Sequence, residues 1–375
     1  MSEVVIVWAK RTPIGRAGGQ FHTLEPSDLV APLLKQAIKD TVGDASLVDD
    51  VMIGNVVGPG GNVARVSLLQ AGFPVTVPGV TIDRQCGSGL EAIMRGFEAI
   101  KSGQAQIILA GGVESVSRAP WKMVQPTRPG AMPTLYTRAP FTPAAYGDPD
   151  MGIAAEEVAA RYQITREAQD YYAFSSHQKA VTSQRTGRFN KEILPLQGVM
   201  TDECPRADTS VEKLAHLHPV FLPEGTVTAG NACPLNDGAA IVMLMSHEAC
   251  LHYKLTAYAT IVDATAAGVM PDILGMGPVP ATQKLLARQQ LQVTDIDIVE
   301  FNEAFASQVL ACLQQLKIPQ HLVNIGGGAL ALGHPYGASG AILITRLVHE
   351  LKKGQRGLAT LGIGGGMGLS MLVTR

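Results

Sequence analysis

The residue types around Cys86 could support nucleophilic catalysis. The chain reads Asp-Arg-Gln-Cys-Gly-Ser-Gly at 83–89, between an apolar run that ends at Ile82 and a helical pattern that continues through Ile100. This order predicts a strand, a tight turn and a helix, with the thiol on the turn. Unpaired backbone N–H groups at a helix N-terminus favour a thiolate. A buried structural cysteine is the alternative, but the flanking glycines leave room for a substrate and favour a nucleophile.

Three further segments could supply polar groups to the same site. His334 precedes a second glycine-rich turn at 335–340, and we interpret it as a catalytic base or an oxyanion donor. Asn302 and Glu303 follow an apolar strand, where they could instead cap a helix. A glycine cluster at 364–368 could offer backbone N–H groups to an oxyanion or a phosphate. No helical pattern follows this cluster, which argues against a dinucleotide site.

The elements that hold these residues occur twice. A shift of 251 positions aligns 86–112 with 337–363 without gaps and gives eight identities. Each copy contains a turn, a helix, a Lys-x-Gly-Gln turn and an apolar strand. The repeat therefore predicts two similar α/β halves in one chain.

The remaining pattern predicts elements around this repeat and an insertion between its copies. Strands are expected at 4–9, 239–245, 257–264 and 369–374, helices at 27–42 and 279–289, and a turn followed by a strand at 293–300. From 118 to 149 the chain is rich in proline and threonine and has no lasting periodicity; helical patterns follow at 153–162 and 166–185. We interpret this middle region as an insertion carried by the first half.

Composition excludes several classes of function. The 375 residues are 46% hydrophobic and 17% charged, with a net charge of −2, so nothing indicates a nucleic-acid or membrane-surface partner. No apolar run reaches the ~18 residues of a membrane span. The chain begins without a leader pattern, and we expect a cytoplasmic protein. Five widely spaced cysteines without a CxxC pair predict neither disulfides nor a zinc site, and no metal is expected.

Together these motifs resemble the thiolase family along the whole chain. The motifs are Asp-Arg-Gln-Cys-Gly-Ser-Gly (83–89), Ala-Gly-Gly-Val-Glu-Ser-Val-Ser (110–117), Gly-Thr-Val-Thr-Ala-Gly-Asn (225–231), Asn-Glu-Ala-Phe (302–305), Gly-His-Pro (333–335) and Gly-Gly-Gly-Met-Gly (364–368). The resemblance implies two βαβαβαββ halves that form a layered αβαβα core, with an inserted loop domain that binds coenzyme A. The implied domains are an N-terminal half (1–115 plus 236–256), a loop domain (116–235) and a C-terminal half (257–375).

The resemblance also implies a substrate, an assembly and roles for single residues. The substrate would be coenzyme A or its acyl thioester, without a permanent cofactor, and the protein would be a homodimer or homotetramer. Cys86 resembles the acylated nucleophile, and His334 would accept its proton and stabilise an oxyanion. Asn302 would hold the water that completes this oxyanion hole. The backbone N–H groups of Cys86 and Gly364 would form the hole for the acyl-enzyme.

Substrate contacts are implied for six other positions. Arg206 would meet the phosphates or adenine of coenzyme A, Phe221, Ala229 and Cys233 would line the pantetheine path, and Met151 and Phe305 would line the acyl pocket.

The chain departs from the family pattern at the second catalytic cysteine. Gly362 stands at that position, and loss of a positioned acid or base typically costs ~10²–10⁴-fold in rate. Asp150 and Asp83 also replace the residues usual in acetoacetyl-CoA thiolases. The first hypothesis is an acyltransferase that works through an acyl-Cys86 thioester, with thiolysis and condensation impaired. The alternatives are a decarboxylating enzyme like the ketoacyl synthases and a non-catalytic protein that binds CoA thioesters. In a remote variant, Cys233 supplies the missing thiol.

Overall fold

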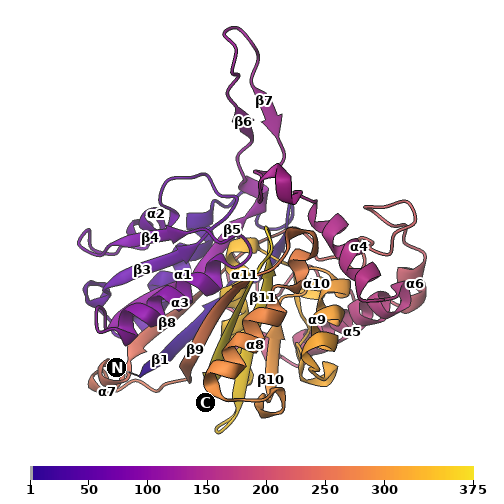
Figure 1. Ribbon diagram of the computed structural model, residues 1–375. Coiled ribbons are helices and arrows are strands. Elements are labelled where there is room, and N and C mark those ends of the chain that lie inside the picture. The colour runs from indigo at the N-terminus through magenta and orange to yellow at the C-terminus, as the bar shows by residue number, and fades with distance from the viewer. Residues whose placement is uncertain (1–2) are drawn as a thin grey trace.

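Strands from both halves of the chain join in one mixed sheet of ten strands, in a computed structural model that describes residues 3–375 (Figure 1). The strands of this sheet are β1 (Val4–Arg11), β2 (Gly15–Arg16), β3 (Asp50–Gly54), β4 (Gly79–Ile82), β5 (Ile107–Ser115), β8 (Asn236–Ser246), β9 (Ala259–Gly268), β10 (Ile298–Phe301), β11 (Arg356–Ile363) and β12 (Met367–Thr374). Their order is β10-β11-β12-β9-β1-β8-β5-β3-β4, and β2 pairs with β8.

In the part of the chain that the structure describes, eleven α-helices alternate with these strands or lie in the insertion. They are α1 (Pro26–Asp40), α2 (Val63–Gln70), α3 (Ser88–Lys101), α4 (Met151–Arg161), α5 (Arg166–Arg185), α6 (Val211–Ala215), α7 (His247–His252), α8 (Pro278–Gln289), α9 (Ala306–Leu316), α10 (Ala329–Leu332) and α11 (Tyr336–Glu350). The strands and helices predicted from the sequence repeat are present within a few residues of their expected bounds. No helix in the described part of the chain is long and apolar enough to cross a membrane.

The two halves share one strand order, which confirms the predicted repeat. The first half runs β4-β3-β5-β8-β1, and the second runs β10-β11-β12-β9 with the same parallel and antiparallel neighbours. At the position that β4 occupies in the first half, the second half has only a single parallel bridge, between Val299 and Val323. Antiparallel pairing of Val4–Ile6 in β1 with Ala259–Ile261 in β9 joins the halves into one sheet.

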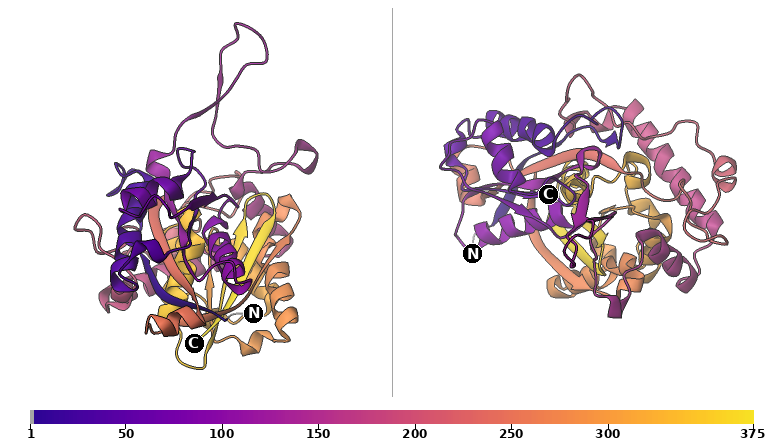
Figure 2. Two further views of the ribbon diagram at one scale, coloured as in Figure 1. Left: turned by 90° about the vertical axis from the view of Figure 1, so that its left-hand side faces the viewer. Right: turned by 90° about the horizontal axis from the view of Figure 1, so that it is seen from above.

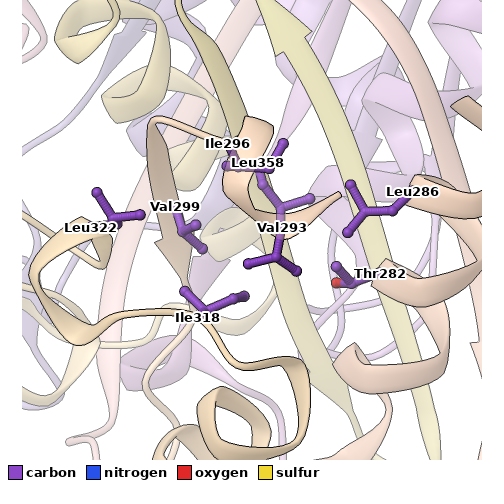
Figure 3. Close-up of a pocket in the computed structure, with 8 residues that line it drawn as sticks. All are labelled: Thr282, Leu286, Val293, Ile296, Val299, Ile318, Leu322 and Leu358. Atoms are coloured by element: carbon purple, nitrogen blue, oxygen red, sulfur yellow. The ribbon is translucent and has the colours of Figure 1, made fainter. Parts of the chain in front are cut away.

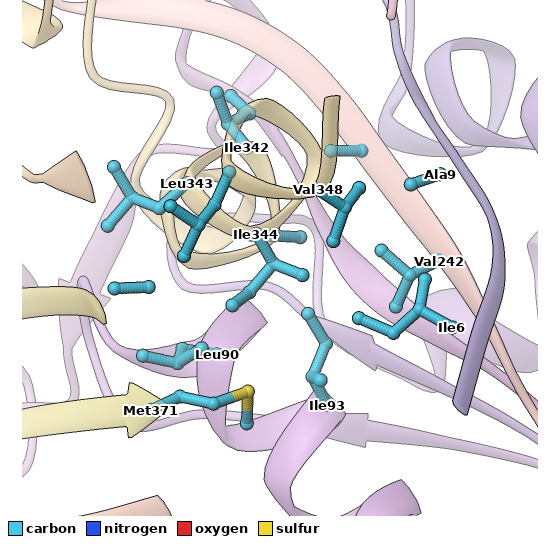
Figure 4. Packing of buried hydrophobic residues seen from close by; sticks show 14 of the residues in the cluster. Ile6, Ala9, Leu90, Ile93, Val242, Ile342, Leu343, Ile344, Val348 and Met371 are labelled. Carbon is cyan, nitrogen blue, oxygen red and sulfur yellow. The ribbon is translucent and has the colours of Figure 1, made fainter. Parts of the chain in front are cut away.

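Helices α3 and α11 form the central layer between the halves. Each of them contacts strands of both halves, whereas α1 and α2 cover the first half from outside and α8 and α9 cover the second. Helix α11 is buried on every side from Gly337 to Val348, as its apolar sequence requires. Its Ile344 points toward Leu90 and Ile93 of α3, whereas Ile342 lies on the opposite side of α11 (Figure 4). The predicted α/β fold with a layered αβαβα core is thus confirmed.

Glycines let the two central helices approach closely. A Cβ atom at Gly89 would lie 2.6 Å from the carbonyl oxygen of Gly337, and one at Gly340 would collide with Leu90. Real side chains essentially never reach such distances, so only glycine fits there. This contact joins the N-terminal turns of α3 and α11, and those turns carry Cys86 and His334.

The insertion between the repeat copies projects from the body. The stretch predicted as irregular, 118–149, contains a short hairpin of β6 (Lys122–Val124) and β7 (Thr134–Tyr136). This hairpin stands away from the rest of the protein in Figures 1 and 2. Helices α4, α5 and α6 then pack beside the second half of the sheet.

Candidate active site

The turn that carries Cys86 is held in a strained shape by its own side chains. Gln85 has a φ of 47°, a left-handed conformation that costs an ordinary residue roughly 1 kcal/mol. The Ser88 hydroxyl accepts a hydrogen bond from the Arg84 N–H (2.9 Å) and donates one to the Gln85 carbonyl (2.6 Å). Helix α3 begins at Ser88, which confirms the predicted strand, turn and helix.

Burial keeps the Cys86 thiol protonated. Loss of solvent raises its pKa to about 11, and the carboxylates of Glu114 and Asp83 add to this effect. Hydrogen bonds from the N–H groups of Gly364 and of Cys86 itself lower the pKa, but by less than burial raises it. The expectation of a ready thiolate at this helix N-terminus is therefore wrong. The sulfur does lie beside the two N–H groups predicted to form an oxyanion hole.

His334 has one tautomer that satisfies its neighbours. Its Nδ1 lies 2.6 Å from the Ser339 hydroxyl oxygen, which lies 3.0 Å from the Pro335 carbonyl. A carbonyl only accepts, so Ser339 donates to Pro335 and Nδ1 of His334 must carry the proton. The Asn302 amide nitrogen, a donor, lies 3.4 Å from Nε2. Burial lowers the pKa of His334 to about 4, so at pH 7 it is neutral, with its lone pair on Nε2.

Backbone contacts fix the position of His334. Its N–H donates to the side-chain oxygen of Asn236 (2.9 Å), and the Asn236 amide donates to the Gly15 carbonyl (2.9 Å). His334 also forms a parallel bridge with Leu235, at the end of the insertion. Gly333 has a φ of 112° and would place a Cβ atom against Asn236, so this position requires glycine.

Asn302 and Glu303 have different environments. Asn302 faces His334, and α9 begins only at Ala306, so Asn302 does not cap this helix. Glu303 is a buried structural carboxylate that joins α5 to the second half of the sheet. It accepts hydrogen bonds from Tyr172 (3.0 Å), Ser176 (2.7 Å), Asn324 (2.6 Å) and the N–H of Leu330 (3.1 Å).

The amide of Gln308 lies beside Gly362, where a second cysteine would extend. A Cβ atom at Gly362 would lie 2.7 Å from the Gln308 nitrogen and 3.3 Å from the Gly275 carbonyl oxygen. The buried side-chain oxygen of Gln308 has no hydrogen-bond partner in the described residues. A neutral carboxamide thus occupies this space, and it is no acid or base near pH 7.

Four of the predicted substrate contacts form one wall. Cys233 donates its N–H to the Ala304 carbonyl (3.0 Å), next to Phe305. Phe221 lies edge-on to Phe305, with ring centroids 6.3 Å apart, and packs on Gly152 beside Met151. Burial, and then the Cys86 thiol, raise the pKa of Cys233. Cys233 is therefore near Cys86 but poorly suited to replace the missing acid or base.

The other two predicted contacts are exposed on the insertion. Ala229 lies on the turn at 228–231, and Arg206 lies beside His177, whose Nδ1 accepts the Arg206 N–H (3.2 Å). Burial and the Arg206 charge lower the pKa of His177 to about 4. Asp150, the N-cap of α4, is solvent-exposed and 3.5 Å from Arg138.

Three residues at the site were not predicted from the sequence. The Phe141 ring covers Gly364, 3.0 Å from the position of a Cβ atom there. The Tyr336 ring lies edge-on to His334, 5.1 Å between centroids. Glu114 is fully buried, with a pKa raised to about 7 by burial, and accepts the Gly337 N–H (2.9 Å). Phe141 lies in a region without periodicity, so no pattern could have placed it.

An apolar pocket lies away from the residues of the candidate site. It is lined by aliphatic side chains of 286–322 and by Thr282 and Leu358, and has essentially no volume for a water molecule (Figure 3). Such a gap reflects packing and offers no polar partner to a substrate. Residues 3–375 contain no group of three or more His, Cys, Asp or Glu that could hold a metal ion.

Comparison with known proteins decides the family. The family models "Thiolase, N-terminal domain" and "Thiolase, C-terminal domain" match residues 4–248 and 255–375. The chain belongs to the thiolase family. It is 46% identical to "Putative acetyl-CoA C-acetyltransferase VraB" of Staphylococcus epidermidis, over 100% of this chain and 99% of that protein. As a thiolase-family member with such relatives, it is an acyltransferase.

Solved thiolase structures share the whole fold. The acetyl-CoA acetyltransferase of Bacillus anthracis superposes with a TM-score of 0.93 at 38% identity, over 100% of this chain and 98% of that one. Human mitochondrial 3-ketoacyl-CoA thiolase superposes with a TM-score of 0.93 at 36% identity, over 100% and 99% of the two chains. A further structure of the human thiolase contains CoA, with a TM-score of 0.93 at 36% identity over 99% and 98%.

Proposed function

We propose that this protein transfers acyl groups from an acyl-CoA or 3-ketoacyl-CoA through a thioester on Cys86. For an acyl-CoA, Nε2 of His334 takes the thiol proton while the sulfur attacks the thioester carbonyl. The N–H groups of Cys86 and Gly364 stabilise the oxyanion, and the departing CoA thiolate recovers the proton from His334. The position of the Cys86 sulfur beside both N–H groups is the observation that carries this proposal.

Other residues would position the substrate. Asn302 would hold a water that, with His334, completes a second oxyanion hole. Arg206, exposed on the insertion, suits a phosphate or adenine of coenzyme A. The wall of Phe221 and Cys233, with the exposed Ala229, would guide the pantetheine, and Met151 and Phe305 would border the acyl group. No permanent cofactor is needed for these steps.

Gly362 would affect two kinds of acyl transfer differently: exchange between thiols, and cleavage or formation of a carbon–carbon bond. Exchange of an acyl group between thiols needs only Cys86, His334 and the first oxyanion hole, so we expect it to persist. Cleavage or formation of a carbon–carbon bond also needs a proton transferred at the substrate α-carbon, and we expect it to be ~10²–10⁴-fold slower. Neither the relatives nor the geometry favours the decarboxylating or non-catalytic alternatives.

Mass spectrometry of the intact protein tests the acyl-enzyme. After mixing with acetyl-CoA or a 3-ketoacyl-CoA, the wild-type protein should gain the mass of one acyl group. The Cys86→Ser variant should not gain it as a thioester, and Cys233→Ser should still be acylated. An unmodified wild-type mass with thioesters of several chain lengths would contradict the proposal.

We also propose a homo-oligomer acting in the cytoplasm. Strand β4 ends the sheet, and Val80 on it is 39% exposed, so this open edge suits antiparallel pairing with a second copy. The projecting hairpin exposes Trp121, Met123 and Met132, which could join two dimers into a tetramer. Sedimentation should give a dimer or tetramer for the wild-type protein and a smaller species for Val80→Lys. The five free cysteines agree with a reducing compartment.

A further inference from the structure

An internal cavity is lined by Asn302 and Ser339, the two residues whose side chains contact the ring of His334. All the residues that line it are buried, and they include Glu300, Asn302, Ser339 and Arg346. It offers about 20 Å³ to water-sized spheres, and one water needs roughly 10–15 Å³. The cavity therefore has room for one water molecule and has polar groups to bind it.

Two of these groups lack partners. Glu300 accepts a hydrogen bond on Oε2 from Nε of Arg346 (2.9 Å), but its Oε1 has no partner in the described residues, and neither has Nη2 of Arg346. Both residues are at most 1% exposed. A buried polar group without a hydrogen bond costs about 1–3 kcal/mol, so an internal water here is strongly favoured.

Ser339 has room for one more hydrogen bond. Its hydroxyl donates to the Pro335 carbonyl and accepts from Nδ1–H of His334, which leaves one lone pair free. Ser339 is 3% exposed and lines the same cavity as Glu300 and Arg346. A water that accepts from Nη2 of Arg346 could donate its two protons to Glu300 and Ser339. Both unpartnered atoms and the free lone pair of Ser339 would then have a hydrogen-bond partner.

We propose that an internal water links Glu300 and Arg346 through Ser339 to Nδ1 of His334, which makes Ser339 and Glu300 positioning residues for the catalytic base. The chain of hydrogen bonds holds the proton on Nδ1 and directs the lone pair of Nε2 into the site. When Nε2 takes the Cys86 proton, the carboxylate of Glu300 stabilises the imidazolium through Ser339 and the water. No bond other than S–H and N–H changes in that step. This inference rests on the proposed role of His334 as a base.

The charges around Glu300 support this role. The buried cations Arg11 and Arg346 face three carboxylates, Glu192, Asp202 and Glu300, so one negative charge is in excess. Burial raises the pKa of Glu300 to about 7, despite the opposing charge of Arg346. Other groups that interact electrostatically with Glu300 are Glu350 from α11 and Tyr172, Lys179 and Arg188 from the insertion.

The tautomer of His334 can be measured without any acyl transfer. Nitrogen-15 NMR of histidine-labelled protein at pH 7 should show His334 neutral with its proton on Nδ1. Ser339→Ala should shift the ring toward a mixture of tautomers. Thr345→Val is the matched control, because Thr345 is a buried residue of α11 that does not line the cavity and whose hydroxyl has no partner within residues 3–375. A wild-type proton on Nε2, or equal spectra in Ser339→Ala and Thr345→Val, would overturn the inference.

Acyl exchange supplies the second readout. The rate of isotope exchange between acetyl-CoA and labelled CoA should fall about 10–100-fold in Ser339→Ala, the loss typical of groups that orient a metal-ligating histidine, and remain unchanged in Thr345→Val. The wild-type rate should rise through about pH 7 as Glu300 ionises, and this inflection should vanish in Glu300→Gln. If wild-type protein exchanges no acyl group, the proposed function fails while the NMR result still decides the tautomer. A high-resolution crystal structure with an empty cavity would overturn the water link.

Discussion

At the scale of single residues, the proposed nucleophile and the proposed base are both neutral at pH 7. Burial raises the pKa of Cys86 to about 11 and lowers that of His334 to about 4. A preformed thiolate–imidazolium pair is therefore not the resting state. Proton transfer must accompany attack on the substrate, when the oxyanion hole and the bound thioester can stabilise the developing charge.

Alkylation of Cys86 in the free protein should report its high pKa. Below pH 11 the thiolate fraction falls about tenfold for each pH unit, so the iodoacetamide rate at Cys86 should climb about tenfold per unit between pH 7 and 10. Peptide mass mapping should locate the label, and Cys86→Ser should lack it. A rate that levels off near pH 7 would mean that the thiolate is already formed there.

Replacement of Gly362 tests the missing acid or base. In Gly362→Cys the new Cβ atom would lie 2.7 Å from the Gln308 amide nitrogen and 3.3 Å from the Gly275 carbonyl oxygen, so the end of the Gln308 side chain must shift to make room for the thiol. Thiolysis of a 3-ketoacyl-CoA should then rise ~10²–10⁴-fold. Gly362→Ala adds the same Cβ atom without a thiol and should show no gain. Equal rates in the two variants would place the limitation elsewhere.

At the scale of elements, the close crossing of α3 and α11 sets the geometry of the site. Each helix begins two residues after a reactive side chain, Cys86 or His334, and Gly89 allows their first turns to touch. Because interiors pack as densely as crystals, a small displacement here would move both groups.

An added methyl group at this crossing should destabilise the protein. In Gly89→Ala the Cβ atom would lie 2.6 Å from a backbone oxygen that cannot move independently, and overpacking of this kind costs typically 1–3 kcal/mol. Urea denaturation should detect this loss. Gly268→Ala, at the end of β9, meets nothing closer than 3.8 Å and should stay within about 0.5 kcal/mol of wild type. Similar losses in both variants would argue against tight helix packing.

At the scale of the whole molecule, a buried ionic cluster ties the insertion to both halves. Arg11 of β1 binds Glu192 (2.8 Å) and Asp202 (2.6 Å) from the insertion, and both Arg11 and Arg346 of α11 lie near the Phe189 ring, 5.3 and 5.0 Å from its centroid. These charged side chains thus link β1, α11 and the insertion, and they become buried only when all three regions have folded.

Loss of one charge from this cluster should be severe. Arg11→Met leaves two carboxylates buried without their main partner, and breaking such a pair costs about 3–5 kcal/mol. Lys213→Met removes an exposed pair with Asp208 and should cost at most about 1 kcal/mol. Chemical denaturation of the two variants gives the comparison. A small, equal effect would mean that the cluster is solvated.

Much of the fold follows from local pattern in the sequence. Apolar runs such as Val4–Ala9 and the repeated turn–helix–strand unit predict elements because backbone preference and burial act over a few residues. Strand β3 and helix α2 lacked such a signal and were not foreseen. The turn at Cys86 was foreseen, because glycine spacing and a helix start are local features.

The sequence by itself determined the family, the α/β architecture and the choice of candidate site residues, since side-chain type and order along the chain carry that information. Only the tertiary structure decided their chemical state. Packing of segments far apart in the chain buries Cys86, and this burial opposes the expected thiolate. The same packing places Gln308 beside Gly362 and encloses Ser339, Glu300 and Arg346 around one cavity. Desolvation and contact depend on every neighbour at once, and no local pattern records them.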